Sequence, residues 1–262
     1  VMVQDRWGDP VDPEKVAEAF AANPQASLLA FVHSETSTGV RSDAKTLCGI
    51  AKANDALVIV DTVTTLGGID LRVDEWGADA VYSGTQKCLS CVPGLSPMTF
   101  SPAAVERIQT RQTKVQSWFL DMQLVMGYWG GDSKRAYHHT APVNALYALH
   151  EALLILEDEG LEASFSRHHA NHEQLVSGLE AMGLEMAVAP DWRLPQLNAV
   201  CIPDGVNDAE VRGRLLQEFN LEIGAGLGAL AGKQWRIGLM GHASNPVNVE
   251  RCLTALKHVL SH

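Results

Sequence analysis

Short apolar runs alternate with amphipathic segments along the N-terminal part of the chain. Consecutive apolar residues between polar turns favour buried strands, whereas apolar positions that recur every three or four residues favour helices. Asp12 before Pro13 predicts a helix start, because an acidic N-cap followed by proline in the first turn is a common helix signal. Buried strands are expected at residues 27–33, 56–60, 80–83 and 98–100, with further helices beginning after residues 43 and 101. This alternation indicates a parallel α/β sheet.

The C-terminal part has a different pattern. Residues 142 to about 182 read as helix, with a break at Gly160. After this long connector, short strands alternate with helices. The strands are expected at 199–202 and 235–239, and the helices at 208–219 and 246–260. We therefore predict two domains, with residues 1–160 forming most of a large α/β domain and residues 161–262 forming a small C-terminal α+β domain.

Polar residues follow the expected strands of the first domain. Asp61 directly follows the strand at 56–60, and Lys87 follows the strand at 80–83 after a small, hydroxyl-rich turn. A hydroxyl-rich loop, 34–39, follows the first strand. In parallel α/β sheets, ligands bind beyond the carboxyl ends of the strands. These three segments are therefore expected to converge on one site.

Asp61 and Lys87 together suit a pyridoxal phosphate enzyme. A lysine amine can form an imine with an aldehyde, and a carboxylate can hold the proton on a pyridine nitrogen. A carboxylate about 3 Å from a pyridinium contributes roughly 5 kcal/mol at an effective dielectric near 20. Taken alone, however, such a lysine is more often solvated or ion-paired, and such an aspartate more often caps a turn. Further motifs must support the hypothesis.

Composition and charge narrow the possible partners. The chain has 262 residues, 46% of them hydrophobic, and a formal net charge of -11. No basic stripe is available to neutralise phosphates, so neither a nucleic acid nor an anionic membrane is expected as a partner. No apolar run approaches the roughly 20 residues of a membrane span. Five scattered cysteines favour a reducing compartment. We expect a cytoplasmic protein, although no N-terminal targeting segment is visible.

Three other motifs suggest different chemistry. Cys88 and Cys91 have the Cys-x-x-Cys spacing of redox proteins, but they directly follow Lys87 and are expected to be small buried packing residues. His138 and His139 could be metal ligands, but adjacent histidines in an extended segment are expected to point apart, and no metal is expected. The glycines of segment 224–228 suggest a nucleotide loop, yet no buried strand precedes them and no helix follows.

Several ordered motifs resemble those of the class V aminotransferases, and more narrowly the alanine–glyoxylate and serine–pyruvate aminotransferase group. They are HSETSTGV at 33–40, VDTVTTLGG at 60–68, YSGTQK at 82–87, YHHTAP at 137–142, GLG at 226–228 and RIGLMG at 236–241. The resemblance covers the whole chain and is more specific than any single motif. It implies the PLP-dependent transferase fold type I, which is aspartate-aminotransferase-like. Here this fold would consist of a partial large parallel-sheet domain and a small C-terminal α+β domain.

The resemblance implies that five residues contact the cofactor of their own subunit. Lys87 would be the catalytic imine lysine and the base that moves a proton between the substrate α-carbon and C4′ of pyridoxal 5'-phosphate. Asp61 would pair with the pyridine nitrogen, and Val63 would pack under the ring. Thr36 would lie near the ring hydroxyl, where the family often has serine, so the hydroxyl is kept and a methyl group is added. Gln86 would bind the phosphate.

The resemblance also implies a homodimer with shared active sites. Tyr137 and Thr140 would reach the phosphate of the cofactor in the neighbouring subunit. Arg236 would bind the substrate carboxylate through a bidentate contact, which lysine could not reproduce. The small-molecule partners would be a small amino acid and a 2-oxo acid.

One part of the family pattern is missing from this sequence. The family also uses a Ser-Gly-His-type phosphate loop and an aromatic residue that stacks on the cofactor ring, both upstream of the first strand seen here. We therefore expect that the sequence lacks its N-terminal segment, and that cofactor binding is crippled in this chain alone. The opening residues Val1, Met2 and Val3 look like the end of a strand.

The function expected from the resemblance is PLP-dependent transamination of a small amino acid, alanine or serine, with glyoxylate or pyruvate as acceptor. Enzymes that use ureidoglycine share these motifs, so the donor stays open. Two alternatives also remain: a class V lyase or cysteine desulfurase, and a non-catalytic fragment that keeps the fold but not the site.

Overall fold

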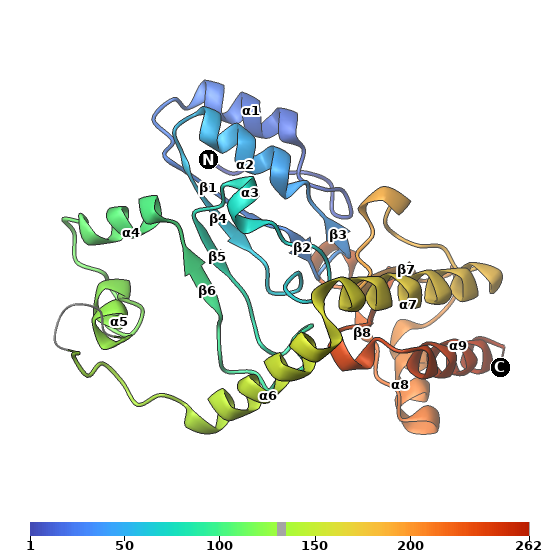
Figure 1. The fold of residues 1–262 in the computed structure, drawn as a ribbon. Coiled ribbons are helices and arrows are strands. Elements are labelled where there is room, and N and C mark those ends of the chain that lie inside the picture. The colour runs from blue at the N-terminus through green and yellow to red at the C-terminus, as the bar shows by residue number, and fades with distance from the viewer. Residues whose placement is uncertain (130–134, 262) are drawn as a thin grey trace.

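The computed structural model describes residues 1–129 and 135–261. Its first sheet has the strand order β1-β4-β5-β6, with bounds Leu28–Val32, Leu57–Asp61, Ala80–Tyr82 and Met98–Phe100 (Figure 1). Strands β1, β4 and β5 are parallel, as predicted. Strand β6 is antiparallel to β5, so the expectation of a parallel sheet is wrong for this strand. The β5–β6 connection, residues 83–97, is described throughout and contains no helix, whereas a helix is the usual crossover between parallel strands.

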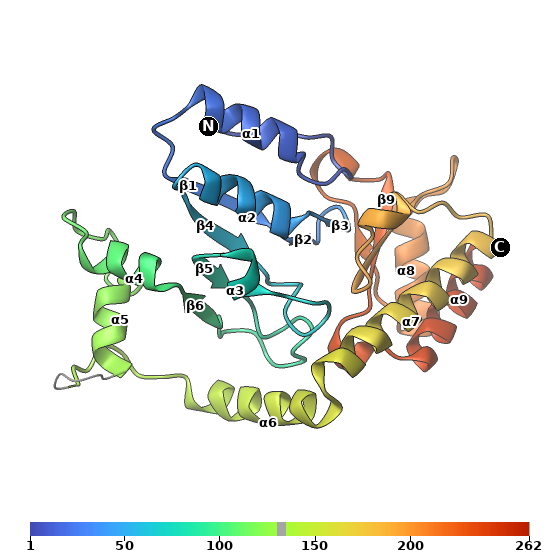
Figure 2. The ribbon, with the colours of Figure 1, turned by 45° about the horizontal axis from the view of Figure 1, so that its top comes forward.

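Three helices lie on the same side of this sheet in both ribbon views (Figures 1 and 2): α1 Pro13–Ala22, α2 Ala44–Ala53 and α3 Val73–Trp76. The side chains of Asp12 and Asp43 cap α1 and α2 by accepting hydrogen bonds from backbone N–H groups in the first turn, which the sequence predicted for both. The apolar faces of the helices close over the sheet. The buried residues of this core include Val16, Phe20, Leu47, Val58, Val60 and Val81.

The C-terminal part has its own sheet and core. Strands β7 Leu197–Cys201, β9 Gln234–Gly238 and β8 Gly224–Ala225 form an antiparallel sheet in the order β7-β9-β8. Helices α7 Leu161–Ala181, α8 Asp208–Phe219 and α9 Pro246–Leu260 pack with it. The core is built around Trp235, which is fully buried. The helix bounds of α8 and α9 agree with the sequence prediction, and the two domain ranges stay a prediction.

The remaining elements connect these two parts. The hairpin strands β2 Ser34–Glu35 and β3 Val40–Arg41 enclose the hydroxyl-rich loop. The other helices are α4 Pro102–Gln109, α5 Met122–Trp129 and α6 Val143–Glu159. Short 3-10 turns occupy Pro190–Trp192, Gly228–Leu230 and Gly241–Ala243. Residues 1–3 form no strand, contrary to the expectation from the sequence.

Helix α6 runs along the outside of the molecule and joins the two parts (Figure 2). None of its residues is buried, although Tyr147 and Ile155 are apolar and 74% and 63% exposed. Large exposed apolar patches commonly mark interaction sites, so this face has the character of an interaction surface. Among the residues described, no helix has both the length and the apolarity needed to cross a membrane.

Candidate active site

Asp61 lies at the carboxyl end of β4, between the ends of two neighbouring strands. Its register partners are Val32 on β1 and Tyr82 on β5. The carboxylate Oδ1 accepts a hydrogen bond from the backbone N–H of Val63 at 2.9 Å. Hydrogen bonding with Asp61, together with burial and the charge of Asp61, raises the pKa of the neighbouring Tyr82 to about 12. Asp61 is thus an anchored carboxylate at the ligand-binding edge of the sheet.

Lys87 lies in a tight turn one strand further along. The turn is closed by Thr85, whose hydroxyl donates to the carbonyl of Val92 at 2.6 Å. Ser83 donates to the carbonyl of Thr62, which directly follows Asp61, at 3.0 Å. Lys87 is half-buried and Gln86 is exposed. The loops that carry the lysine and the aspartate are therefore joined by direct hydrogen bonds.

Thr36 and Arg236 come from different parts of the chain and meet. Thr36 lies in the loop between β2 and β3, and Arg236 lies on β9. The Arg236 guanidinium donates from Nη1 to the backbone carbonyl of Thr36 at 3.1 Å and from Nε to the carbonyl of Ala225 at 2.7 Å. The neighbouring Gln234 donates to the carbonyl of Ser37 at 3.1 Å. These contacts fix β9 against the hydroxyl-rich loop.

Tyr137 and Thr140 form a separate pair. The two hydroxyl oxygens are 2.6 Å apart, and both residues are exposed, Tyr137 to 73%. They lie in the segment between α5 and α6, on the outer edge of the molecule (Figure 1). Within the described residues, no hydrogen bond joins this pair to Asp61, Lys87 or Arg236. The structure therefore leaves this pair apart from the other candidate residues, and its role in a partner's site stays a prediction.

The expectation that His138 and His139 point apart is wrong. Their Nδ1 atoms are 2.8 Å apart, and Nε2 of His138 lies 3.1 Å from the carbonyl oxygen of Trp118. The indole of Trp118 packs on the His138 ring with 4.0 Å between centroids. Aromatic packing thus draws the two rings together. Within the described residues, no group of three or more His, Cys, Asp or Glu side chains is arranged to hold a metal ion.

The structure adds hydroxyl contacts to which the sequence reasoning gave no role. Thr65 donates its hydroxyl hydrogen to Ser34 Oγ at 2.8 Å, and its oxygen lies 3.2 Å from Nδ1 of His33. These three buried side chains connect the segments that follow β1 and β4. In the sequence, the only signal for Ser34 and Thr65 is that each lies in a hydroxyl-rich segment. Tyr82 belongs to the motif before Lys87, but its proximity to Asp61 depends on the register of β4 and β5, which the sequence does not give.

The prediction that Cys88 and Cys91 are buried packing residues is confirmed for Cys88 only. Cys88 is buried and burial raises the pKa of its thiol to about 12, whereas Cys91 is only half-buried. The Cys88 thiol lies 3.5 Å from the carbonyl of Thr64 and packs against Gly68, where a Cβ atom would stand 2.6 Å from the sulfur. A thiol so hard to ionise is a poor nucleophile. Cys88 therefore packs the Asp61 loop against the Lys87 loop.

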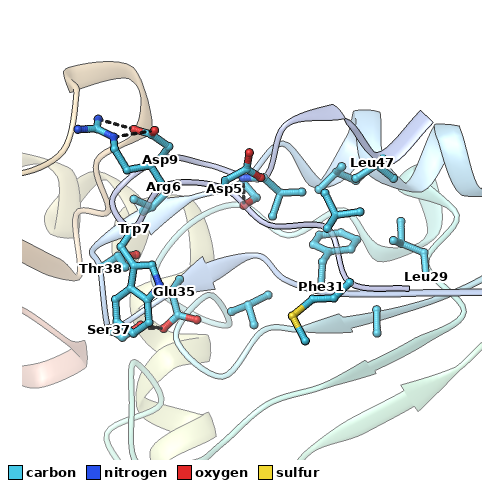
Figure 3. A pocket seen from close by; sticks show the side chains of 18 of the residues that line it. Asp5, Arg6, Trp7, Asp9, Leu29, Phe31, Glu35, Ser37, Thr38 and Leu47 are labelled. Carbon is cyan, nitrogen blue, oxygen red and sulfur yellow. Dashed lines mark hydrogen bonds and ion pairs between the residues drawn. The ribbon is translucent and has the colours of Figure 1, made fainter. Parts of the chain in front are cut away.

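A cavity of about 560 Å³ lies beside this site rather than within it (Figure 3). Its walls come from the N-terminal segment, strand β1 and the hydroxyl-rich loop, and they include Trp7, Glu35, Ser37 and Thr38. Neither Asp61 nor Lys87 lines it. The Trp7 ring also fills the space above Gly228, where a Cβ atom would be 2.6 Å from it, so this glycine is explained by packing and not by a nucleotide.

The comparison with known protein families decides which family this site belongs to. The sequence model described as "Aminotransferase class-V" matches residues 9–240. The chain belongs to the class V aminotransferases. Enzymes of this family depend on pyridoxal 5'-phosphate, which is the cofactor that the motifs implied.

Class V relatives match nearly all of the chain. It is 35% identical to the (S)-ureidoglycine–glyoxylate transaminase of Bacillus subtilis, over 99% of the chain and 66% of the relative. It is 38% identical to the alanine–glyoxylate aminotransferase of Oryctolagus cuniculus, over 95% of the chain and 64% of the relative. The chain thus spans slightly less than two thirds of the length of these curated relatives.

Solved class V structures share the fold. The alanine–glyoxylate aminotransferase from Nostoc sp. superimposes with a TM-score of 0.94 at 47% identity, over 98% of this chain and 67% of the other. The ureidoglycine–glyoxylate aminotransferase from Bacillus subtilis gives the same TM-score at 38% identity, over 98% of this chain and 66% of the other. The fold is therefore the PLP-dependent transferase fold type I, as the resemblance implied.

The donor set suits pyridoxal phosphate. Lys87 offers a primary amine for the aldehyde, Thr36 a hydroxyl and Gln86 an amide. Asp61 offers a carboxylate for the pyridine nitrogen. A carboxylate has about four acceptor sites, and the contacts with Val63 and Tyr82 occupy two of them. Asp61 can therefore accept a further donor while it stays anchored.

Proposed function

We propose that this chain carries most of the active site of a PLP-dependent aminotransferase of the alanine–glyoxylate or serine–pyruvate type. The observation that carries the proposal is the placement of Asp61 and Lys87 at the carboxyl ends of adjacent parallel strands, joined by the hydrogen bond from Ser83 to Thr62. The substrates are a small amino acid, alanine or serine, and glyoxylate or pyruvate. The reaction divides into two half-reactions that share one site.

The cofactor, when bound, supplies an aldehyde for covalent attachment and a protonated ring that accepts electrons. Lys87 would hold the cofactor through its amine and would act as the base that moves a proton between the substrate α-carbon and C4′ of the cofactor. Asp61 keeps the ring nitrogen protonated, since its negative charge stabilises the neighbouring positive charge. Val63 would pack under the ring, Thr36 would lie by the ring hydroxyl, and Gln86 would hold the phosphate.

Arg236 orients the substrate in this proposal. Its contacts with the carbonyls of Thr36 and Ala225 fix the plane of the guanidinium. A planar, fixed guanidinium binds a carboxylate through two parallel hydrogen bonds, which holds the α-carbon in one position relative to Lys87. The half-buried position of Arg236 strengthens such a contact relative to one in open water.

A homodimer would complete the site. Tyr137 and Thr140 are exposed and paired with one another at the outer edge of the chain, from which they would bind the phosphate of the partner subunit's cofactor. The uncovered apolar face of α6, which begins directly after this segment, would lie in the same interface. We further propose that residues 1–160 and 161–262 form the large and the small domain, whose cores consist of separate sets of residues.

The desulfurase alternative gains no support from Cys88. A desulfurase needs a reactive thiolate, whereas burial raises the pKa of Cys88 to about 12. A solved cysteine desulfurase from Thermococcus onnurineus is only 15% identical, so the likeness shows the fold alone.

The test uses the protein expressed from its complete gene, mixed with pyridoxal phosphate. We expect the visible absorbance of cofactor bound to lysine, and borohydride reduction followed by peptide mapping should place the label on Lys87. Alanine, serine and ureidoglycine are then added singly, and the donor is the one that bleaches the band. Glyoxylate or pyruvate should restore it. Lys87→Ala should abolish both steps.

Two results would overturn the proposal. Full transaminase activity in Lys87→Ala would show that Lys87 is not the catalytic lysine. A protein that gains no lysine-bound absorbance at saturating cofactor would instead be a non-catalytic relative that keeps only the fold. Release of sulfide from cysteine without any keto acid would identify the lyase alternative.

A further inference from the structure

The turn that carries Lys87 is held by the segment that follows Arg236. Ser90 lies three residues after Lys87, and its backbone N–H donates to the Lys87 carbonyl at 3.0 Å. The Ser90 hydroxyl accepts a hydrogen bond from the backbone N–H of His242 at 2.8 Å. This contact joins positions 152 residues apart in the chain. It therefore connects the Lys87 turn to the end of the strand that carries Arg236.

Ser90 and Gly241 both adopt backbone conformations that this contact requires. Ser90 has φ +56°, one of three non-glycine residues in the left-handed region among those described. Gly241 has φ +55°, and a Cβ atom there would stand 1.9 Å from Ser90 Oγ and 2.8 Å from the carbonyl oxygen of Cys88. A strained residue that persists in a structure is held by its surroundings. Here the two loops are packed backbone to backbone, with no space for an extra atom.

Helix α7 holds Gly241 from the other side. The backbone N–H of Gly241 donates to Nε2 of His168 at 2.9 Å, and Nδ1 of His168 lies 2.7 Å from the carbonyl oxygen of Ser164. His168 is fully buried, and burial lowers the pKa of its imidazole. The ring is therefore neutral, with a hydrogen on Nδ1 and a lone pair on Nε2. In this form it satisfies both backbone partners.

Neighbouring side chains of α7 complete the attachment. Arg167 donates from Nη1 to the carbonyls of Gly241 and Ser244 at 2.7 and 2.8 Å, and Glu159 pairs with its other nitrogens. The hydroxyl of Ser164 donates to the carbonyl of Gly67, in the segment after Asp61, at 2.7 Å. Helix α7 thus holds both the segment that follows Asp61 and the segment that follows Arg236. The segment after Arg236 in turn holds the turn of Lys87.

We propose that Ser90 and His168 are positioning residues that hold Lys87 at a fixed place relative to Arg236. The inference rests on the proposed transaminase function, because it concerns the distance between the base and the group that binds the substrate carboxylate. Ser90 acts on the Lys87 turn through His242. His168 acts one step further away, by fixing Gly241 in the conformation that presents the His242 N–H to Ser90.

The kinetic test compares Ser90→Gly with Ser96→Ala in the protein expressed from its complete gene. Ser90→Gly removes the hydroxyl and accepts φ +56° without strain, so it should fold. Ser96 is an exposed serine in the same connection and serves as the control. We expect kcat per cofactor-loaded site to fall roughly tenfold in Ser90→Gly, because small misplacements of a catalytic group are costly. KM for the amino donor should change less than about twofold, because the Arg236 contacts do not involve Ser90.

A rescue variant separates positioning from simple loss of stability. Ser90→Cys keeps a weak acceptor at the same γ position without adding a heavy atom, so it should recover part of kcat. A merely structural role would lower the melting temperature and the number of loaded sites, while kcat per loaded site would stay at the wild-type value. That result, or equal kcat in Ser90→Gly and Ser96→Ala, would overturn the proposal.

Amide hydrogen exchange gives a readout that needs neither cofactor nor activity. Loss of one hydrogen bond of typical strength should speed exchange roughly fivefold at the His242 amide in Ser90→Gly and at the Gly241 amide in His168→Leu, which has no acceptor atom. His169→Gln, which changes the exposed neighbour of His168, should leave both amides unchanged. Unchanged exchange in both test variants would show that the contacts do not hold the loop. Failure of the proposed function would look different: wild-type protein would not attach cofactor to Lys87 at all.

Discussion

Tyr82 and Asp61 are register partners at the carboxyl ends of β5 and β4, and hydrogen bonding with the Asp61 carboxylate raises the pKa of the Tyr82 phenol to about 12. The groups that interact with the carboxylate, the Tyr82 phenol and the Val63 N–H, are both neutral donors. A neutral donor orients the charge without cancelling it. The charge of Asp61 is therefore available for a pyridinium. Substitutions of Asp61 and of Tyr82 should for this reason have different effects on kcat.

Asp61→Asn should lower kcat at saturating cofactor by about a hundredfold or more, whereas Tyr82→Phe should lower it by no more than about fivefold. Removal of the charge costs several pKa units of support for the protonated ring, and two units already correspond to about a hundredfold. Loss of one neutral hydrogen bond costs about 1 kcal/mol. Steady-state kinetics with titrated cofactor sites measures both. Equal losses in the two variants would show that the phenol, and not the charge, supports the ring.

His33 should make the protein less stable as the pH falls from about 6.5 to 4. Burial, with the nearby charge of Arg41, lowers its pKa to about 4, and Asp43 opposes this only in part. Above pH 6.5 the imidazole is neutral in both folded and unfolded chains. Between 6.5 and 4 the unfolded chain binds a proton that the folded chain does not, so the free energy of unfolding drops, by about 3 kcal/mol when complete.

Urea unfolding at a series of pH values measures this dependence. His33→Gln keeps a polar side chain that can bond Thr65 but cannot titrate, so the loss between pH 6.5 and 4 should become smaller in this variant. His168 and His172 also have lowered pKa values through burial, and they should account for part of the remaining slope. An identical slope in His33→Gln and wild type would show that His33 is already charged in the folded protein.

The parts of the fold that local signals specify were predictable. Asp12 with Pro13 marked α1, and the bounds of α8 and α9 followed from helical periodicity between capping residues. Asp61 and Lys87 could be placed at strand ends because a short apolar run before a lone polar residue is a local pattern. The family motifs added roles that no local pattern carries.

Features that depend on contacts far apart in the sequence were not predictable. The antiparallel direction of β6 follows from the way its connection folds back, with Ser83 bonded to Pro97. The approach of His138 to His139 follows from packing against Trp118. The Ser90–His242 contact joins two loops, and nothing in the sequence around either residue indicates that the other is its partner. In each case the decisive partner lies in another element.

Gly241→Ala should destabilise the protein by about 2–4 kcal/mol, because it combines a left-handed backbone with overlap against Ser90 Oγ and the Cys88 carbonyl. Gly183→Ala is the matched control. Gly183 has φ +79°, but no atom lies within 4 Å of the place where a Cβ atom would stand, so only the conformational cost of about 1 kcal/mol applies. Thermal or urea unfolding measures both, and equal losses would show that the loops can separate without cost.

Arg236→Lys should raise KM for the amino donor about tenfold or more, while kcat at saturating donor falls less than about threefold. Lysine keeps the positive charge but loses the planar pair of N–H groups that binds a carboxylate in two places, and it cannot bond both the Thr36 and the Ala225 carbonyls as the guanidinium does. Arg111→Lys changes an exposed arginine outside the site and should leave both constants unchanged. A primary amine donor without a carboxylate should be used equally well by Arg236→Lys and wild type. If KM for alanine and serine did not change in Arg236→Lys, the substrate carboxylate would have to bind another group.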